Sequence, residues 1–175
     1  ILRESESREV VQYAKSVERA GNYLLSLINN ILDITRIESK KLDIIEEKFS
    51  LRQLVQEVCL IGAKQAEAKN LEFVVDVEET LPKYLEGDAL HIKQVILNLI
   101  NNAVKYTKKG KVFLEVCQEE KQISFSVKDT GIGIKKEDME ALFDMFMRAD
   151  IKRHRNIEGS GLGLTIAKEL CEQMG

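Results

Sequence analysis

The stretch "ALHIKQVILNLINNAVKYT", at residues 89–107, has the pattern of one long amphipathic helix. Aliphatic residues recur every three to four positions, and Asp88, just before the stretch, is a residue type that caps helix N-termini. Asn98 and Asn102 stand at i and i+4 and therefore share one face. Asparagine is a poor helix-interior residue, so this pair needs an explanation. Either the amides bond to local backbone or water, or their oxygens are aimed at a hard cation.

The segments on either side of this helix mix helices and strands without strict alternation. Before it, the sequence predicts a helix within 50–70 opened by a capping box at Ser50 and Gln53, a strand at 71–77 and a loop at 81–88. After the helix at 89–107, it predicts strands at 111–118 and 122–129 joined as a hairpin. A short helix at 135–146, a loop at 147–158 and a final helix at 161–174 follow. This order predicts the α/β class, as a sandwich with a mixed sheet packed on helices.

The first forty residues have a heptad pattern of their own. Apolar or small residues recur at alternating spacings of three and four, at Val10, Tyr13, Val17, Ala20, Leu24, Leu27, Ile31 and Ile34. A second row at Ala14, Ile28 and Leu32 widens the stripe, as a four-helix bundle requires. The pattern favours a bundle helix whose partners lie on other chains or in sequence not present here. The alternative is a helix packed on its own domain. We therefore divide the chain at 1–43 and 44–175.

Composition excludes several classes of protein. The chain has 175 residues, is 44% hydrophobic and 31% charged, and carries a net charge of −3, which argues against a general nucleic-acid binder. No apolar run is long enough to span a bilayer. The three cysteines, Cys59, Cys117 and Cys171, are far apart and form no C-x-x-C motif, so neither a zinc site nor a disulfide framework is indicated and a reducing compartment fits.

Two glycine-rich stretches complete the candidate site. "DTGIGI" at 129–134 follows a predicted strand, and "EGSGLGL" at 158–164 precedes the last helix. Each could be a plain turn or hinge, although glycines at a helix N-terminus also leave backbone N–H groups open to an anion. Neither stretch matches a P-loop or a dinucleotide fingerprint. Lys105 and Tyr106, one turn after Asn102, offer a point charge suited to phosphate and a flat ring suited to a base.

The order of these motifs resembles the catalytic and ATP-binding domain of sensor histidine kinases. Residues 98–107 look like the family's N box, 129–133 its first glycine box, 143–146 its F box and 159–164 its second glycine box. The helix ending in "LINNILDITRIES" (27–39) resembles the second helix of the dimerisation and histidine-phosphotransfer hairpin. The implied fold is the Bergerat α/β sandwich, preceded by a long bundle-forming helix. The implied activity is transfer of a phosphoryl group from ATP to histidine.

The resemblance implies a role for each motif residue. Asp129 would accept a hydrogen bond from the exocyclic amine of adenine, with Gly131 and Gly133 letting the backbone approach the ring. Asn102 would hold Mg²⁺ between the phosphates, with Asn98 beside it. The remaining nucleotide-binding residues implied are Lys105 and Tyr106, Phe146 of the F box, Arg148 in an ATP lid at 147–158, and Gly159, Ser160, Gly161, Leu162, Gly163 and Leu164 of the second glycine box. The lid also supplies Lys152, Arg153 and Arg155.

The chain departs from the family pattern in two places. The family's phosphoacceptor lies in an H-E-x-x-T-P motif, whereas His91 and His154 stand in other contexts, as a partly exposed helix residue and a solvated lid residue. The helix that carries the acceptor is therefore expected to be absent. The strand pair that closes the family's domain, with its G-x-G-[ST]-x-F stretch, is also expected to be absent, which would leave a sheet edge exposed. The implied partners are a response-regulator receiver domain and a second copy of the full protein, in the cytoplasmic part of a membrane-anchored sensor.

Two other functions fit the same motifs. Related ATPases of the chaperone, gyrase and mismatch-repair type hydrolyse ATP with a glutamate four residues before the metal asparagine. Asn98 stands at that position, and an amide is a poor general base. The other alternative is a degenerate domain that binds nucleotide weakly and serves as a dimer scaffold. The intact Asn102, Asp129 and glycines count against it.

Overall fold

The computed structural model describes residues 2–39, 42–143 and 161–175. The chain divides into two compact units, Ile1–Leu42 and Asp43–Gly175, each of which is described here by itself. No helix of the described residues is both long and apolar enough to cross a membrane. The positions predicted for Phe146, Arg148, Gly159 and Ser160, and the predicted lid at 147–158, lie outside the described residues.

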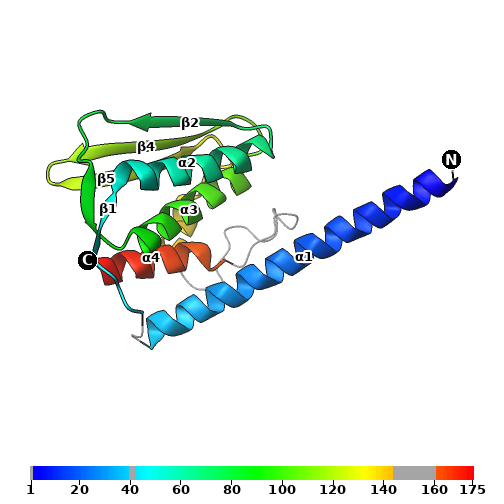
Figure 1. Ribbon diagram of the computed structural model, residues 1–175, viewed down its shortest axis with the longest axis horizontal. Coiled ribbons are helices and arrows are strands. Elements are labelled where there is room, and N and C mark those ends of the chain that lie inside the picture. The colour runs from blue at the N-terminus through cyan, green and yellow to red at the C-terminus, as the bar shows by residue number, and fades with distance from the viewer. Residues whose placement is uncertain (1, 40–41, 144–160) are drawn as a thin grey trace. The chain divides into compact units, whose positions relative to one another are not determined.

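The first unit is a single helix, α1 (Leu2–Glu38), of 37 residues (Figure 1). Gly21 and Asn22 do not interrupt it, which confirms the helix that the heptad pattern predicts. Several residues of the predicted seam are exposed in the structure, including Tyr13 at 68% and Val17 at 72%. Packing of this stripe into a bundle stays a prediction.

The second unit contains the remaining strands and helices. They are β1 (Glu47–Ser50), α2 (Leu51–Glu67), β2 (Glu72–Val77), β3 (Tyr84–Gly87), α3 (Ala89–Tyr106), β4 (Lys111–Glu119), β5 (Gln122–Asp129), two 3₁₀ turns (Lys136–Asp138 and Glu140–Phe143) and α4 (Gly163–Met174). Most bounds agree with those predicted from the sequence.

A mixed sheet forms one layer of this unit. Its strand order is β2-β4-β5, with β2 parallel to β4 and β5 antiparallel to it. The buried side chains of Val112, Leu114 and Val116 point from β4 toward the helices. Figure 1 shows α2, α3 and α4 on the same side of this sheet, with α2 and α3 nearer to it. The predicted mixed α/β sandwich is therefore confirmed, and in the described residues β5 forms one edge of the sheet.

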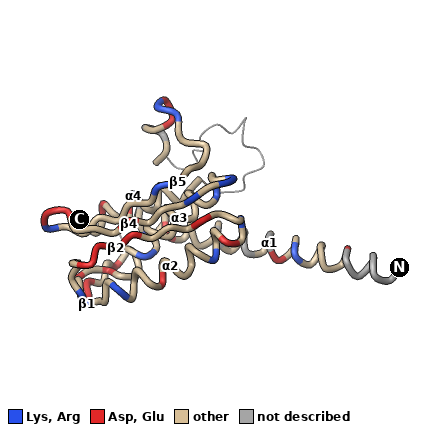
Figure 2. The backbone as a smooth tube through the Cα atoms, turned by 90° about the horizontal axis from the view of Figure 1, so that it is seen from above, with Lys and Arg blue, Asp and Glu red and all other residues tan. Residues whose placement is uncertain are grey.

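The opposite face of the sheet carries ion pairs between strands. Glu72 pairs with Lys111, with 2.9 Å between carboxylate oxygen and ammonium, and Glu115 pairs with Lys128 at 2.7 Å. Figure 2 shows residues of both charge signs distributed along the backbone of this unit.

The structure corrects two of the predicted elements. The segment predicted as a loop at 81–88 contains β3, which pairs with β1, a strand that the sequence did not predict. Each is four residues long, and its partner lies far away in sequence, so local pattern gave no signal. The short helix predicted at 135–146 forms two 3₁₀ turns over its described part. Met139 and Phe143 are exposed there, so over the described part these two residues add no buried apolar surface that would stabilise an α-helix.

The capping box at the start of α2 is half formed. The Gln53 N–H donates to Ser50 Oγ at 3.3 Å, as predicted. The Gln53 side chain, however, donates forward to Glu57 at 3.1 Å instead of reaching back to the cap. A forward i to i+4 pair on an exposed helix face stabilises the helix by a few tenths of a kcal/mol.

Candidate functional site

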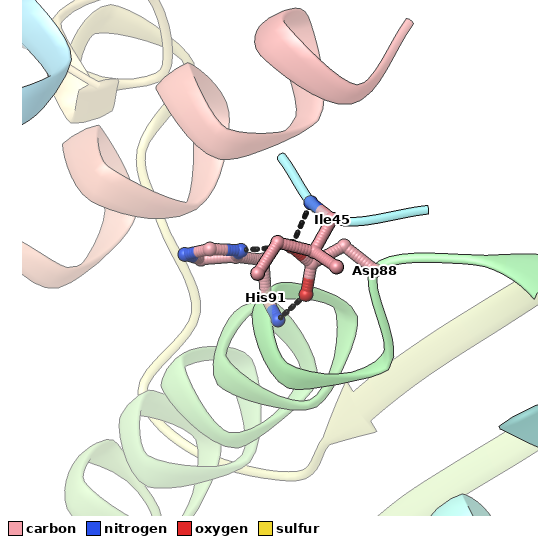
Figure 3. A network of polar contacts seen from close by, with 3 residues as sticks. All are labelled: Ile45, Asp88 and His91. Atoms are coloured by element: carbon pink, nitrogen blue, oxygen red, sulfur yellow. Dashed lines mark hydrogen bonds and ion pairs between the residues drawn. The ribbon is translucent and has the colours of Figure 1, made fainter. Parts of the chain in front are cut away.

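The N-terminus of α3 is fixed by Asp88, the predicted N-cap. Its carboxylate accepts hydrogen bonds from the Ile45 N–H at 3.0 Å and the His91 N–H at 3.0 Å. The His91 ring places Nδ1 2.7 Å from the second carboxylate oxygen (Figure 3). Burial raises the pKa of Asp88, but these hydrogen bonds outweigh it and hold the pKa below its ordinary value. The network ties the segment before β1 to the first turn of α3.

His91 is half-buried, with its side chain 14% exposed, which agrees with the expectation of a partly exposed helix residue. Its pairing with Asp88 was not predicted, although D-x-x-H across an N-cap places the two side chains within reach. The ring is therefore a structural partner of the helix cap.

The predicted N-box residues lie in the second half of α3, away from its N-cap. Asn98, Asn102, Lys105 and Tyr106 are all half-buried. A Cβ built on Gly163 at the start of α4 would lie 3.7 Å from Asn98 Oδ1, so the N box and the second glycine box meet there. The Lys105 ammonium lies 4.8 Å from the centroid of the Tyr106 ring, a cation–π contact.

Asn102 fits the predicted role of a cation ligand. Within the residues that the structure describes, its side-chain amide has no hydrogen-bond partner, so its oxygen is available. The same residues contain no group of three or more histidine, cysteine, aspartate or glutamate side chains that could hold a metal ion. An amide oxygen is a ligand type that hard cations accept alongside other oxygen ligands.

The C-terminus of α3 touches the first glycine box directly. The Thr107 side chain is buried and donates to Ala103 O at 2.7 Å, which closes the helix. The Ile132 N–H donates to Tyr106 O at 3.4 Å, which brings the "DTGIGI" loop against the helix end. Two predicted motifs, 31 residues apart from Asn98 to Asp129, are thereby joined through backbone contacts.

Asp129 ends β5 at this junction and is exposed. Its Oδ1 accepts a hydrogen bond from the Gly131 N–H at 2.8 Å, whereas Oδ2 has no hydrogen-bond partner among the described residues. The turn therefore holds the carboxylate at a fixed angle and leaves one oxygen for a donor outside the protein. A carboxylate presented in this way suits an amino group on a flat base.

Close packing at the same junction requires a glycine at position 131. A Cβ at this position would lie 2.6 Å from Tyr106 O, 2.7 Å from Asp129 Oδ1 and 3.0 Å from Thr107 Oγ1. No side chain fits there without moving the end of α3. Gly133 has φ +66 with open space around it, so its reason to be glycine is conformational.

The second glycine box forms the start of α4. Gly161 has φ +74, Leu162 is buried, and α4 begins at Gly163 without a side-chain cap. The first N–H groups of a helix have no partner within it, so they can meet an anion. Leu164 follows, half-buried in the first turn. This end of α4 lies beside Asn98, on the same side of α3 as the predicted phosphate ligands.

Comparison with known proteins identifies relatives of this chain. Residues 87–175 match the family model described as histidine kinase-, DNA gyrase B- and HSP90-like ATPase. Sensor protein GacS of Pseudomonas syringae pv. syringae is 42% identical over 168 residues, which cover 93% of this chain and 18% of that protein. Sensory/regulatory protein RpfC of Xanthomonas campestris pv. campestris is 41% identical over 166 residues, covering 91% and 23%. The chain thus spans about a fifth of these curated relatives.

A solved structure has the same fold. Full-length ShkA, crystallised in complex with AMPPNP, has a TM-score of 0.80 and 29% sequence identity, covering 94% of this chain and 34% of that one. The matched region includes most of both units of this chain. The mixed sheet packed on helices is that of histidine kinase catalytic domains.

Proposed function

The chain belongs to the histidine kinase-, DNA gyrase B- and HSP90-like ATPase family, and from this premise we propose that it is the ATP-binding catalytic part of a two-component sensor histidine kinase. The observation that carries the proposal is the junction of Asp129, Gly131 and Tyr106. It presents a carboxylate oxygen, Asp129 Oδ2, that has no hydrogen-bond partner among the described residues, on a loop that packs against the Tyr106 carbonyl. That arrangement suits an adenine nucleotide whose phosphates run along α3 toward α4.

In this proposal each described motif has a binding task. Asp129 Oδ2 accepts a hydrogen bond from the exocyclic amine of adenine. This bond selects adenine over guanine, because guanine presents an oxygen at that position. Lys105 binds phosphate oxygens, and the N–H groups at the start of α4 bind the phosphate tail. Phe146, Arg148, Gly159 and Ser160 complete the site in the proposal.

Asn102 is proposed as the protein ligand of Mg²⁺, with Asn98 beside it. Its amide oxygen, which has no hydrogen-bond partner among the described residues, supports this role. When bound, the metal supplies charge neutralisation for the phosphates.

The proposed reaction transfers the γ-phosphoryl group of ATP to a histidine of the dimerisation hairpin. A ring nitrogen attacks the γ-phosphorus, the bond from that phosphorus to the β–γ bridging oxygen breaks, and ADP leaves as the N–P bond forms. Transfer is favoured over hydrolysis because Asn98 stands where hydrolytic relatives place a basic glutamate. An amide does not take a proton from water at neutral pH.

The proposed partners follow from the same family. The phosphoryl group would pass onward to an aspartate of a response-regulator receiver domain, and the full protein would dimerise through α1 and its hairpin partner. The predicted bundle seam of α1 supports dimerisation, because several of its apolar residues are exposed in this chain. We place the domain on the cytoplasmic side of a membrane-anchored sensor, where ATP is available.

Labelling of a separately supplied acceptor hairpin tests the proposed function. The chain should transfer phosphate from labelled ATP to the hairpin in the presence of Mg²⁺. Asn102→Leu should abolish transfer while retaining adenine binding, since Asp129 is unchanged. Steady ATP hydrolysis without transfer would instead support a hydrolytic relative. Loss of transfer and binding together, in a folded variant, would make Asn102 a structural residue.

A further inference from the structure

The end of α3 carries a contact that the family motifs do not include. The last four carbonyl oxygens of a helix have no partner within it. Thr107 and Ile132 bond to the first and last of these in α3. The ammonium of Lys69 donates to the two between them, at 2.9 Å to Val104 O and 3.0 Å to Lys105 O. Each carbonyl at this helix end therefore has an identified donor.

Lys69 reaches this position from another part of the fold. It lies in the short segment between α2 and β2, 35 residues before the first carbonyl that it contacts. The segment is itself fixed, because the Leu71 N–H and the Lys69 N–H both donate to Ala66 O, at 2.9 and 3.0 Å. The Lys69 side chain thus extends from a well-bonded backbone segment, and its ammonium joins that segment to the end of α3.

We propose that Lys69 is a positioning residue for nucleotide binding, because it fixes the last turn of α3 and, through that turn, the adenine-binding loop. That turn carries Lys105 and Tyr106, and the Tyr106 carbonyl holds the loop through Ile132. The inference rests on the nucleotide site of the proposed function and adds a residue that the motifs do not contain.

The charges at this helix end explain why a lysine suits the position. The C-terminus of a helix carries a partial negative charge, which favours a cation. Desolvation against the helix lowers the pKa of Lys69, and the nearby charge of Lys105 lowers it further. The Lys105 ammonium does not bond to these carbonyls and lies 4.8 Å from the centroid of the Tyr106 ring. One lysine holds the helix and the other is left for phosphate.

Lys69→Met tests the proposal, because it keeps the length of the side chain and removes the donor. Lys69→Arg is the rescue variant, since a guanidinium can donate to both carbonyls. Lys83→Met, at an exposed lysine before β3, is the matched control. For each variant of this chain, the affinity for Mg-AMPPNP is measured by calorimetry and amide hydrogen exchange is followed by NMR without nucleotide.

We expect Lys69→Met to weaken nucleotide binding about tenfold, the equivalent of about 1.4 kcal/mol. It should also speed exchange of the Ile132 and Thr107 amides selectively, whereas Lys69→Arg and Lys83→Met stay near the unmutated chain. Lys69→Gln, with a shorter polar side chain, is the second variant if Lys69→Met does not fold. Exchange raised equally at all amides, or unfolding of both of these variants, would show a general folding role and overturn the proposal. Unchanged Ile132 exchange with unchanged affinity would overturn it as well.

The nucleotide-free exchange measurement separates this inference from the proposed function. If the unmutated chain bound no nucleotide, the proposed function would fail. Selective loss of protection at Ile132 would even then show that Lys69 positions the loop. If the chain bound nucleotide but Lys69→Met left both measurements unchanged, only the inference would fail.

Discussion

At the scale of single residues, Asp129 carries the most specific chemistry. One carboxylate oxygen accepts a hydrogen bond from the Gly131 N–H, and the other has no hydrogen-bond partner among the described residues. In Asp129→Asn the amide oxygen can keep the turn, which leaves an NH₂ group facing the adenine amine. Two donors then face each other where a donor faced a charged acceptor.

We therefore expect Asp129→Asn to weaken ATP binding by about 1.5–3 kcal/mol, as for a hydrogen bond to a charged group. Guanine presents an acceptor at that position, so GTP should lose less affinity than ATP. Calorimetry with both nucleotides on both proteins measures this. Equal affinities of the unmutated chain for ATP and GTP would contradict the selection of adenine by Asp129.

Gly131 and Gly163 offer a matched pair of glycine-to-alanine changes. A Cβ at Gly131 would lie 2.6 Å from a backbone oxygen, whereas one at Gly163 would meet nothing closer than 3.7 Å. We expect Gly131→Ala to lower the free energy of unfolding by about 1–3 kcal/mol, because overpacking displaces the helix end. Gly163→Ala should leave it unchanged or slightly raised. Urea unfolding followed by circular dichroism gives both values, and equal losses would show that the junction is not tightly packed.

At the scale of elements, α3 depends on its N-cap. Asp88→Ala removes the acceptor of the Ile45 N–H, the His91 N–H and the His91 ring. The expected loss is about 1–2 kcal/mol at pH 7, the upper range for a helix cap. Urea unfolding measures it, with the exposed Asp76→Ala as a control on a neighbouring strand.

The cost of Asp88→Ala should also depend on pH. The folded-state pKa of Asp88 lies below its ordinary value. Its contribution is therefore complete above the unfolded pKa of about 4, and it is lost as the pH falls through the folded value. The difference in stability between the two proteins should narrow on acidification from pH 7 to pH 3. A difference that stayed constant over this range would show that the carboxylate charge is not what stabilises the cap.

At the scale of the whole molecule, the chain should transfer phosphate to a supplied hairpin without labelling itself. The His91 ring is 14% exposed and has Nδ1 2.7 Å from Asp88 Oδ2, so that nitrogen is engaged in the helix cap. After incubation with labelled Mg-ATP, acid-labile phosphate should appear on the hairpin alone. Stoichiometric phosphohistidine on His91 or His154 would place the acceptor within this chain.

The sequence by itself determined the elements and the motifs that have strong local signals. The helix at 89–107 with its Asp88 cap, the hairpin of β4 and β5 and the heptad helix all follow from periodicity and capping within one segment. The family and the mixed sandwich were likewise accessible from ordered motifs, because each motif is a short run of residues whose chemistry depends on spacing along the chain.

Only the tertiary structure decided what depends on contacts between distant segments. The pairing of β1 with β3, the bonds from Lys69 to the end of α3 and the packing of Gly131 against Tyr106 each join residues about 25 or more positions apart. A lysine in a charged loop has the same local pattern whether it is solvated or caps a helix. A glycine in a turn likewise does not reveal which atom lies where its Cβ would be. These contacts arise only when the layers pack, because packing sets which donors and acceptors lie within reach.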